Sequence, residues 1–429
     1  MKYRIGLVCP PFTGHLNPTL SLALELQKRK YETILFYYTN RSINTVKLEE
    51  LKIKTIFIGS EADEKLINNS LKILSGLSGS KANKQTMYIY GLLARMNLRC
   101  LPDKIEETKC EALLIDQSLF EGESIAYVTA RPFVTICNAL ILNPDINLPP
   151  PFMEWQLNLS LFGKLRNLIG YAYVGLKYGE TTKIVREYRE QKNLPAYPSF
   201  FKGYFEKLWS STAIISQQPV EFDFKRSSLK STFHYTAPFI DPELRKQTNF
   251  PWNKLDRKPL IYASIGTLQH SVDNIYYKIA RACVGVNCQL VMSLGKNNKG
   301  IRIDNLPTNA IVVNYAPQLE LLEKASLCIT HAGINTTLEC LSYGVPMVAI
   351  PIANDQPGIA ERIKWTGTGK VLNRRSKIFQ LNQAIKEVLQ NNIYRKNALK
   401  MQQSIQEING VKVAADIIEK ATASLCAPQ

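Results

Sequence analysis

The residues best suited to chemistry lie in the last third of the sequence. His331 and Gly333 follow a short apolar run typical of a buried strand, and Asn335 and Thr336 open the helix-like segment behind it. A helix start offers free backbone N–H groups and the positive end of its dipole to a phosphate. Glu339 lies one helical turn further on, where its carboxylate can accept the two hydroxyls of a ribose. The pattern indicates a nucleoside diphosphate site at the carboxyl end of a strand.

Two more polar residues extend this site. Asp355 and Gln356 follow the next apolar run, again at the carboxyl end of a strand, and offer acceptors and donors to sugar hydroxyls. A lone His-x-Gly would indicate only an ordinary strand–turn–helix connection. Because several polar residues stand at strand ends at these spacings, we interpret the stretch as a nucleotide-sugar site.

Two series of short apolar runs, separated by helix-like segments, predict the elements that position these residues. Such runs are typical of buried parallel strands, and their alternation with helices predicts a doubly wound α/β fold. The first series is 4–9, 33–39, 53–59, 112–116, 132–137 and 212–217, and the second is 259–266, 289–295, 310–315, 327–330 and 346–351. A proline-rich stretch between them reads as a linker. We expect Rossmann-like domains at 1–240 and 259–397, joined by a linker at 241–258.

The box from Tyr315 to Gln356 resembles the signature of the UDP-glycosyltransferase superfamily, and the likeness extends along nearly the whole chain. Members are inverting enzymes of the GT-B fold, in which two Rossmann-like domains face each other across a cleft. Tyr315 stands where plant members have tryptophan, and the short interval from Gln318 to His331 is similar to the bacterial branch. The resemblance also implies that helices at 398–429 pack back on the first domain.

The same resemblance assigns the donor-site residues to parts of the ligand. Uracil would be held by Tyr315, Ala316 and Gln318, the diphosphate by Ser264, Gly266, Thr267, His331, Gly333, Asn335 and Thr336, the ribose by Glu339, and the donor sugar by Asp355 and Gln356. A carboxylate that binds the ribose diol favours UDP over dTDP.

A second constellation lies at residues 10–18, where His15 follows the first apolar run and precedes a helix. By itself it indicates either a helix-capping loop with an incidental histidine or a general base. The resemblance implies the base, with Asp116, at the end of the run 112–116, as the acidic partner that orients the ring. The deprotonated acceptor would attack a UDP-α-sugar and give a β-glycoside. The alternative for Asp116 is a strand-end acceptor for backbone donors.

The prediction of the acceptor depends on the apolar segment 148–208, which is rich in Phe, Tyr, Trp and Leu. This segment indicates helices packed on the sheet, a pocket for an apolar ligand, or a face that touches lipid. The strings at 262–269 and 354–369 are similar to bacterial carotenoid glucosyltransferases, which implies a hydrophobic hydroxylated acceptor, a carotenoid such as zeaxanthin first, and glucose as the sugar. The alternative acceptors are a flavonoid, a macrolide or a membrane glycolipid. The alternative functions are a sugar epimerase and a non-catalytic nucleotide-sugar-binding relative.

Composition narrows the class of protein. The 429 residues are 45% hydrophobic and 21% charged, which excludes a disordered chain. The net charge of +17 is spread over both halves without a run of five like charges. Such dispersal argues against a nucleic-acid partner and leaves contact with an anionic membrane surface as a hypothesis.

Missing motifs add further expectations. The sequence has no pair of aspartates two positions apart, no P-loop and no G-x-G-x-x-G after a strand, so we expect neither a metal nor a cofactor. Its nine cysteines include no C-x-x-C pair, and no apolar run reaches 18 residues. We expect reduced thiols and a cytoplasmic location, with peripheral membrane contact as the alternative.

Overall fold

The first sheet organises the N-terminal half of the protein. The computed structural model describes residues 3–40, 43, 45–196, 209–227, 229–245, 248–266, 275–295 and 306–426. All pairings in this seven-stranded sheet are parallel, in the order β3-β2-β1-β4-β5-β6-β7. Its strands are β1 (Arg4–Val8), β2 (Glu32–Tyr37), β3 (Lys54–Phe57), β4 (Ala112–Asp116), β5 (Phe133–Cys137), β6 (Ala213–Ser216) and β7 (Phe233–Tyr235). The helices of this half are α1 (Thr13–Lys28), α2 (Thr45–Glu50), α3 (Glu61–Ser75), α4 (Gly79–Thr108), α5 (Gly122–Val128), α6 (Leu161–Lys177) and α7 (Gly179–Gln191), followed by the short 3-10 turns η1 (Val220–Phe222), η2 (Pro242–Leu244) and η3 (Trp252–Lys254).

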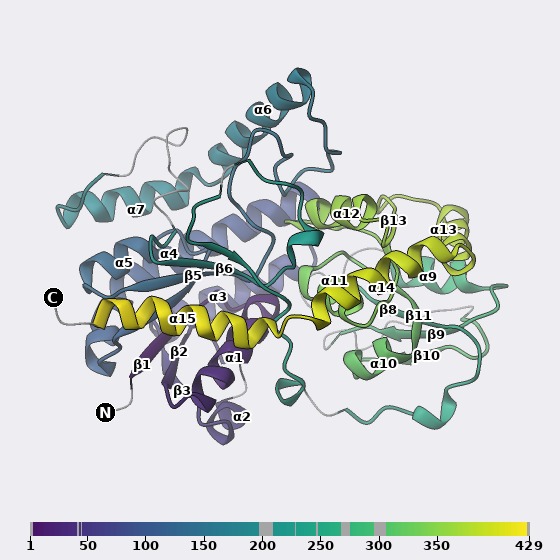
Figure 1. Cartoon of the computed structure of the whole chain (residues 1–429), viewed down its shortest axis with the longest axis horizontal. Coiled ribbons are helices and arrows are strands. Elements are labelled where there is room, and N and C mark those ends of the chain that lie inside the picture. Colours follow the sequence, from purple (N-terminus) through teal and green to yellow (C-terminus); the bar gives the residue numbers. More distant parts are fainter. Residues whose placement is uncertain are drawn as a thin grey trace.

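The second sheet repeats the plan with six parallel strands in the order β10-β9-β8-β11-β12-β13. Its strands are β8 (Leu260–Ser264), β9 (Gln289–Ser293), β10 (Ile311–Val313), β11 (Ala325–Thr330), β12 (Met347–Ala349) and β13 (Gly369–Val371). The helices are α9 (Ile275–Cys283), α10 (Gln318–Lys324), α11 (Ile334–Ser342), α12 (Gln356–Trp365), α13 (Ile378–Gln390), α14 (Asn392–Gln406) and α15 (Gly410–Cys426). Two parallel sheets with crossover helices confirm the predicted α/β class (Figure 1).

Both sheets reverse their strand order at one point, and these points position the site. In the first sheet the reversal falls between β1 and β4, and in the second between β8 and β11. Open α/β sheets bind ligands just outside the carboxyl ends of the strands at such a switch point, where the loops diverge and leave a crevice. A ligand site is therefore expected in the loops that follow β1, β4, β8 and β11.

The C-terminal helix joins the two halves. Helix α14 packs on α11 of the second half, whereas α15 runs across to α1 of the first (Figure 1). Ala414, Ala415 and Ile418 are buried in the same hydrophobic cluster as residues of α1. At the edge of this contact Arg29 donates hydrogen bonds to Asp416 and Glu419, at 2.5 and 2.6 Å.

Two strands, β7 and β13, are not predicted from the sequence. β7 and β13 are three-residue edge strands with partly exposed side chains, so they lack the continuous apolar run that marks a buried parallel strand. The apolar segment 148–208 forms α6 and α7, and its residues 197–208 lie outside the described part. Within the described ranges, no helix is both long enough and apolar enough to cross a membrane.

Candidate active site

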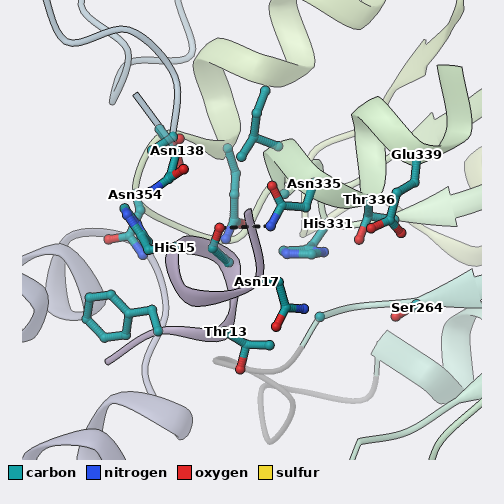
Figure 2. Close-up of a pocket in the computed structure, with 18 of the residues that line it drawn as sticks. Thr13, His15, Asn17, Asn138, Ser264, His331, Asn335, Thr336, Glu339 and Asn354 are labelled. Carbon is teal, nitrogen blue, oxygen red and sulfur yellow. Dashed lines mark hydrogen bonds between the residues drawn. The ribbon is translucent and has the colours of Figure 1, made fainter. Parts of the chain in front are cut away.

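A single pocket is lined by residues that follow strands of both sheets (Figure 2). Most of the site residues expected from the sequence line it, namely His15, Ser264, Gly266, Tyr315, Ala316, Gln318, His331, Gly333, Asn335, Thr336, Glu339, Asp355 and Gln356. Asp116 does not line the pocket but lies behind His15. Thr267, the remaining expected residue, lies outside the described residues.

His15 and Asp116 meet at the switch point of the first sheet. His15 lies in the first turn of α1, directly after β1, and Asp116 is the last residue of β4. Nδ1 of the imidazole is 2.8 Å from Oδ2 of the carboxylate. Only 13% of the His15 side chain is exposed, and none of the Asp116 side chain. With Nδ1–H donated to Asp116, Nε2 is left as the ring atom that can accept a proton.

Further hydrogen bonds hold the Asp116 carboxylate in place. Asn138 Nδ2 donates to Oδ2 at 2.8 Å, while the backbone N–H and hydroxyl of Ser118 donate to Oδ1 at 2.9 and 2.6 Å. A buried carboxylate with this many donors stays ionised and fixed. Burial opposes ionisation, but the charge and hydrogen bond of His15 and the Ser118 bonds outweigh it and lower the pKa of Asp116.

The same pairing sets the basicity of His15. Burial by itself would lower the pKa of His15, but the Asp116 charge, the hydrogen bond to it and the more distant charge of Asp355 together raise the pKa above its ordinary value. The imidazole is thereby a stronger base than an isolated histidine. A shift in this direction favours proton transfer from an acceptor hydroxyl to the ring.

His331 follows β11 at the switch point of the second sheet. Its ring lies in a space that is left open only because residues 266 and 333 are glycines. A Cβ on Gly266 would lie 2.6 Å from Cε1 and Nε2 of His331, and a Cβ on Gly333 would lie 2.4 Å from Nε2. Gly266 also has φ +79°, a conformation that suits glycine. Burial lowers the pKa of His331 to about 4, so the ring is neutral. Its Nδ1 is buried and has no hydrogen-bond partner among the described residues.

The start of α11 faces the pocket with its backbone, while the Asn335 side chain spans the two halves. Asn335 Nδ2 donates to the Gly14 carbonyl at 2.8 Å, and its Oδ1 accepts from Gln217 Nε2 at 2.9 Å. The sequence predicts that Asn335 binds a diphosphate. In the structure both ends of its amide are engaged with the first half (Figure 2). The backbone N–H groups of the first turn, between Gly333 and Thr337, remain the natural anion donors.

A polar cluster forms the floor of the donor half. Glu339 is buried and accepts hydrogen bonds from Gln318 and from Arg245, which belongs to the linker. Gln318 in turn accepts from the Tyr262 hydroxyl at 3.0 Å. Tyr315 stands at the rim with 36% of its surface exposed. The cluster offers a carboxylate acceptor, Glu339, which is paired with the Arg245 guanidinium.

Asp355 and Gln356 are held at the junction of the two halves. Asp355 Oδ2 accepts the Leu140 N–H at 3.0 Å, and burial raises the pKa of Asp355. Gln356 Oε1 accepts the N–H groups of Ile352 and Ala353 at 2.7 and 3.0 Å. The Gln356 oxygen is therefore turned onto its own loop.

The opposite end of the pocket is apolar. Phe12, Met87, Tyr90, Leu142, Phe152 and Tyr178 line it. All come from the first half, and His15 lies between this region and the donor half. A hydrophobic lining with few polar groups is typical of sites for apolar small molecules.

Four residues of this site were missed by the sequence analysis. Asn138 and Gln217 each follow a strand directly, β5 and β6, and Ser118 lies two residues after β4. The strand-end rule that singled out Asp116 would have found all three. No such signal exists for Arg245, because it belongs to the linker and reaches Glu339 only through the packing of the two halves. Among the residues that the structure describes, no group of three or more His, Cys, Asp or Glu could hold a metal ion.

Comparison with known proteins agrees with this geometry. The sequence model of the family "UDP-glucoronosyl and UDP-glucosyl transferase" matches residues 254–411. The zeaxanthin glucosyltransferase of Pantoea ananas is 26% identical over 423 residues, which cover 97% of this chain and 95% of that protein. The glycosyltransferase of kitacinnamycin superposes with a TM-score of 0.74 at 19% identity, covering 98% and 99% of the two chains. The glycosyltransferase VinC, solved in complex with dTDP, gives 0.68 at 14% identity, covering 98% and 100%.

Two parallel sheets with a shared pocket, superposing on such structures over almost their full length, define the GT-B fold. The family match over residues 254–411 and the near-full-length match to a glucosyltransferase together support a glycosyltransferase of the UDP-glycosyltransferase superfamily, in its bacterial branch.

Proposed function

We propose that the protein transfers a sugar, glucose first, from a UDP-sugar to a hydroxyl of a hydrophobic small molecule with inversion at the anomeric carbon. The observation that carries this proposal is the pocket itself. It has the His15–Asp116 pair and an apolar wall on one side and the start of α11 with His331 on the other.

In the proposed step His15 Nε2 takes the proton of the acceptor hydroxyl as its oxygen attacks the anomeric carbon. The new C–O bond forms on the face opposite the diphosphate, and the old C–O bond breaks with its electron pair leaving on UDP. Asp116 stabilises the imidazolium that results. The α11 backbone N–H groups and the neutral His331 ring, as a hydrogen-bond donor, meet the charge on the leaving diphosphate.

The acceptor is proposed from the lining and from a relative. Six aromatic or aliphatic side chains surround the acceptor end. A similar protein is a zeaxanthin glucosyltransferase. A carotenoid with a terminal hydroxyl is therefore the first acceptor to try, ahead of a flavonoid, a macrolide or a membrane glycolipid.

The base of the donor is proposed from Glu339. A buried carboxylate at this position can accept both ribose hydroxyls, which a deoxyribose cannot supply, so UDP should bind more tightly than dTDP. Glu339→Gln should lose most of that preference in a competition assay. A variant that keeps the full preference for UDP would assign the discrimination to another residue.

The test of the whole proposal is a matrix of donors and acceptors read by product mass. UDP-glucose, UDP-galactose and dTDP-glucose are each combined with zeaxanthin in detergent micelles, a flavonol and a macrolide, and the anomeric configuration of any product is assigned by NMR. A β-glucoside from UDP-glucose is expected. Binding of UDP-glucose without any product would favour a non-catalytic relative, and an α-glycoside would contradict inversion.

Matched histidine variants separate chemistry from folding. His15→Ala should abolish turnover and leave the Kd for UDP unchanged. His234→Ala is the control, because His234 lies on the edge strand β7 and does not line the pocket. Loss of UDP binding in His15→Ala would make His15 a structural residue.

A further inference from the structure

Helix α6 exposes an apolar stripe to solvent. Leu161, Phe162 and Leu176 are 85%, 74% and 81% exposed. Four more large apolar residues of the helix are also exposed, namely Leu165, Leu168, Ile169 and Tyr173. The spacing of these residues follows the turns of a helix, so they form one stripe along its length. We call these seven residues the α6 stripe. Such a contiguous apolar surface is unusual on a soluble domain and marks an interaction site.

The opposite face of α6 leads to the acceptor end of the pocket. Val174 and Tyr178 belong to a buried cluster with Phe120, Leu142 and Trp209. Tyr178, which caps the helix, also lines the pocket, as does Leu142. The helix projects from the first half of the molecule (Figure 1). The stripe therefore lies on the outer side of a helix whose C-terminal end borders the acceptor end of the pocket.

The charged residues on α6 itself all have one sign. From residue 155 to residue 179 the sequence contains no Asp or Glu. Helical geometry places Lys164 along one border of the stripe and Arg166 and Lys177 along the other. Arg166 lies over the Trp155 ring, and the Lys177 ammonium lies 5.0 Å from the centroid of the Tyr173 ring. Aliphatic stems along the apolar surface with cationic heads at its borders are typical of helices that lie in a membrane interface.

These charges favour an anionic lipid surface over a second copy of this chain as the partner of the stripe. A second copy packed symmetrically on the stripe would bring two sets of the same three cations together, with no carboxylate on either helix to meet them. Anionic lipid headgroups supply the complementary charge, and acyl chains receive the leucines and phenylalanine. The net charge of +17 adds long-range attraction of the same sign.

We propose that α6 is a membrane-docking helix, which inserts the α6 stripe into the interface of an anionic bilayer and turns the acceptor end of the pocket toward the lipid. The inference rests on the proposed function only for its purpose, the capture of a hydrophobic acceptor from the membrane. The docking itself requires no catalysis.

The test is co-sedimentation of the full chain with lipid vesicles. We expect binding to vesicles of equal parts phosphatidylcholine and phosphatidylglycerol, weakened by salt, and much weaker binding to phosphatidylcholine alone. The stripe variant Phe162→Ser, Leu165→Ser, Ile169→Ser should bind at least about tenfold more weakly. The border variant Lys164→Gln, Lys177→Gln should show a weaker preference for phosphatidylglycerol than the unaltered protein does.

A control variant holds the number of apolar-to-serine changes constant. Val46→Ser, Phe379→Ser, Ile393→Ser alters exposed residues of α2, α13 and α14, and should bind vesicles as the unaltered protein does. All variants should keep turnover of a water-soluble acceptor, which shows that they fold.

Two results would overturn the docking helix. One is equal vesicle binding by the unaltered protein and the stripe variant, including no binding by either. The other is a concentration-dependent dimer in light scattering that the stripe variant abolishes, which would assign the stripe to a second copy. Absence of turnover with every soluble acceptor would instead refute the proposed function and leave vesicle binding unaffected.

Discussion

Asp116→Asn is the sharpest test of the proposed chemistry, because it removes one charge and changes almost no volume. Asp116 Oδ2 lies 2.8 Å from His15 Nδ1, and the carboxylate side chain is fully buried. An asparagine keeps one oxygen and replaces the other with an NH2 group. In one orientation this group faces the donors His15 and Asn138, and in the other it faces the backbone N–H of Ser118. The imidazolium formed in the transition state then loses its hydrogen-bonded counter-charge and keeps only the more distant Asp355.

The expected loss follows from that single contact. A charge-assisted hydrogen bond in a buried site, present as charge develops, contributes about 2 to 4 kcal/mol, so kcat should fall roughly 30- to 1000-fold. Affinity for UDP should stay the same, since Asp116 does not line the pocket. Ser118→Ala is the matched control. It removes one 2.6 Å bond to the other carboxylate oxygen, leaves the ion pair intact, and should lower kcat by less than about fivefold.

The pH profile adds a readout that a folding defect would not reproduce. In the unaltered enzyme the Asp116 charge raises the pKa of His15, so kcat/KM should fall as pH drops through that raised value and protonates the base. In Asp116→Asn burial remains without the charge, and burial lowers the pKa of His15. The acidic limb of the residual activity should therefore move to lower pH. A kcat within threefold of the unaltered enzyme, or an acidic limb that does not move, would refute the dyad.

Three further predictions concern separate parts of the molecule. Gly333→Ala places a methyl group 2.4 Å from His331 Nε2, so UDP affinity should fall at least about tenfold in calorimetry, and unchanged affinity would show that the ring moves freely. Asn335→Ala removes the bonds to Gly14 and the first half but no backbone N–H; kcat should fall about tenfold with UDP affinity nearly unchanged, and the reverse result would make the side chain a diphosphate ligand. Burial raises the pKa of Glu121 from 4.5 to about 7, so the folded state binds more protons and stability declines as pH rises from about 4.5 to 7. Glu121→Gln should remove that decline, with a gain of about 3 kcal/mol above pH 7 and none near pH 4. Equal melting shifts at both pH values would contradict this prediction.

Much of this site was predictable because one rule generates it. Parallel strands buried on both faces are continuous apolar runs, and the polar residue that ends such a run must lie at the edge where ligands bind. His331 and Asp116 follow from that rule with no knowledge of the packing. His15 needed the additional observation that it stands between the first strand and a helix.

The rule fails where a side chain's partner lies on the other half of the molecule. The sequence places Asn335 at the start of a helix and Asp355 after a strand, yet their polar atoms contact Gly14 and Leu140 of the first half. Arg245 donates a hydrogen bond to Glu339, and it lies between the two sheets in a segment that has no periodic pattern. Such contacts depend on the relative placement of the two sheets, which no local spacing encodes.

Those interdomain contacts also explain why the dyad and the donor site should act as one unit. Asn335 in α11 binds the carbonyl of Gly14, the residue directly before His15. By a second route, Gln217 donates to Asn335 and to the Asn138 carbonyl, and Asn138 donates to Asp116. Both ends of the base–carboxylate pair are thus tied to the helix whose N-terminus should hold the diphosphate. We expect a shift of α11 on donor binding to be transmitted to His15 through these hydrogen bonds, which would link deprotonation of the acceptor to occupation of the donor site.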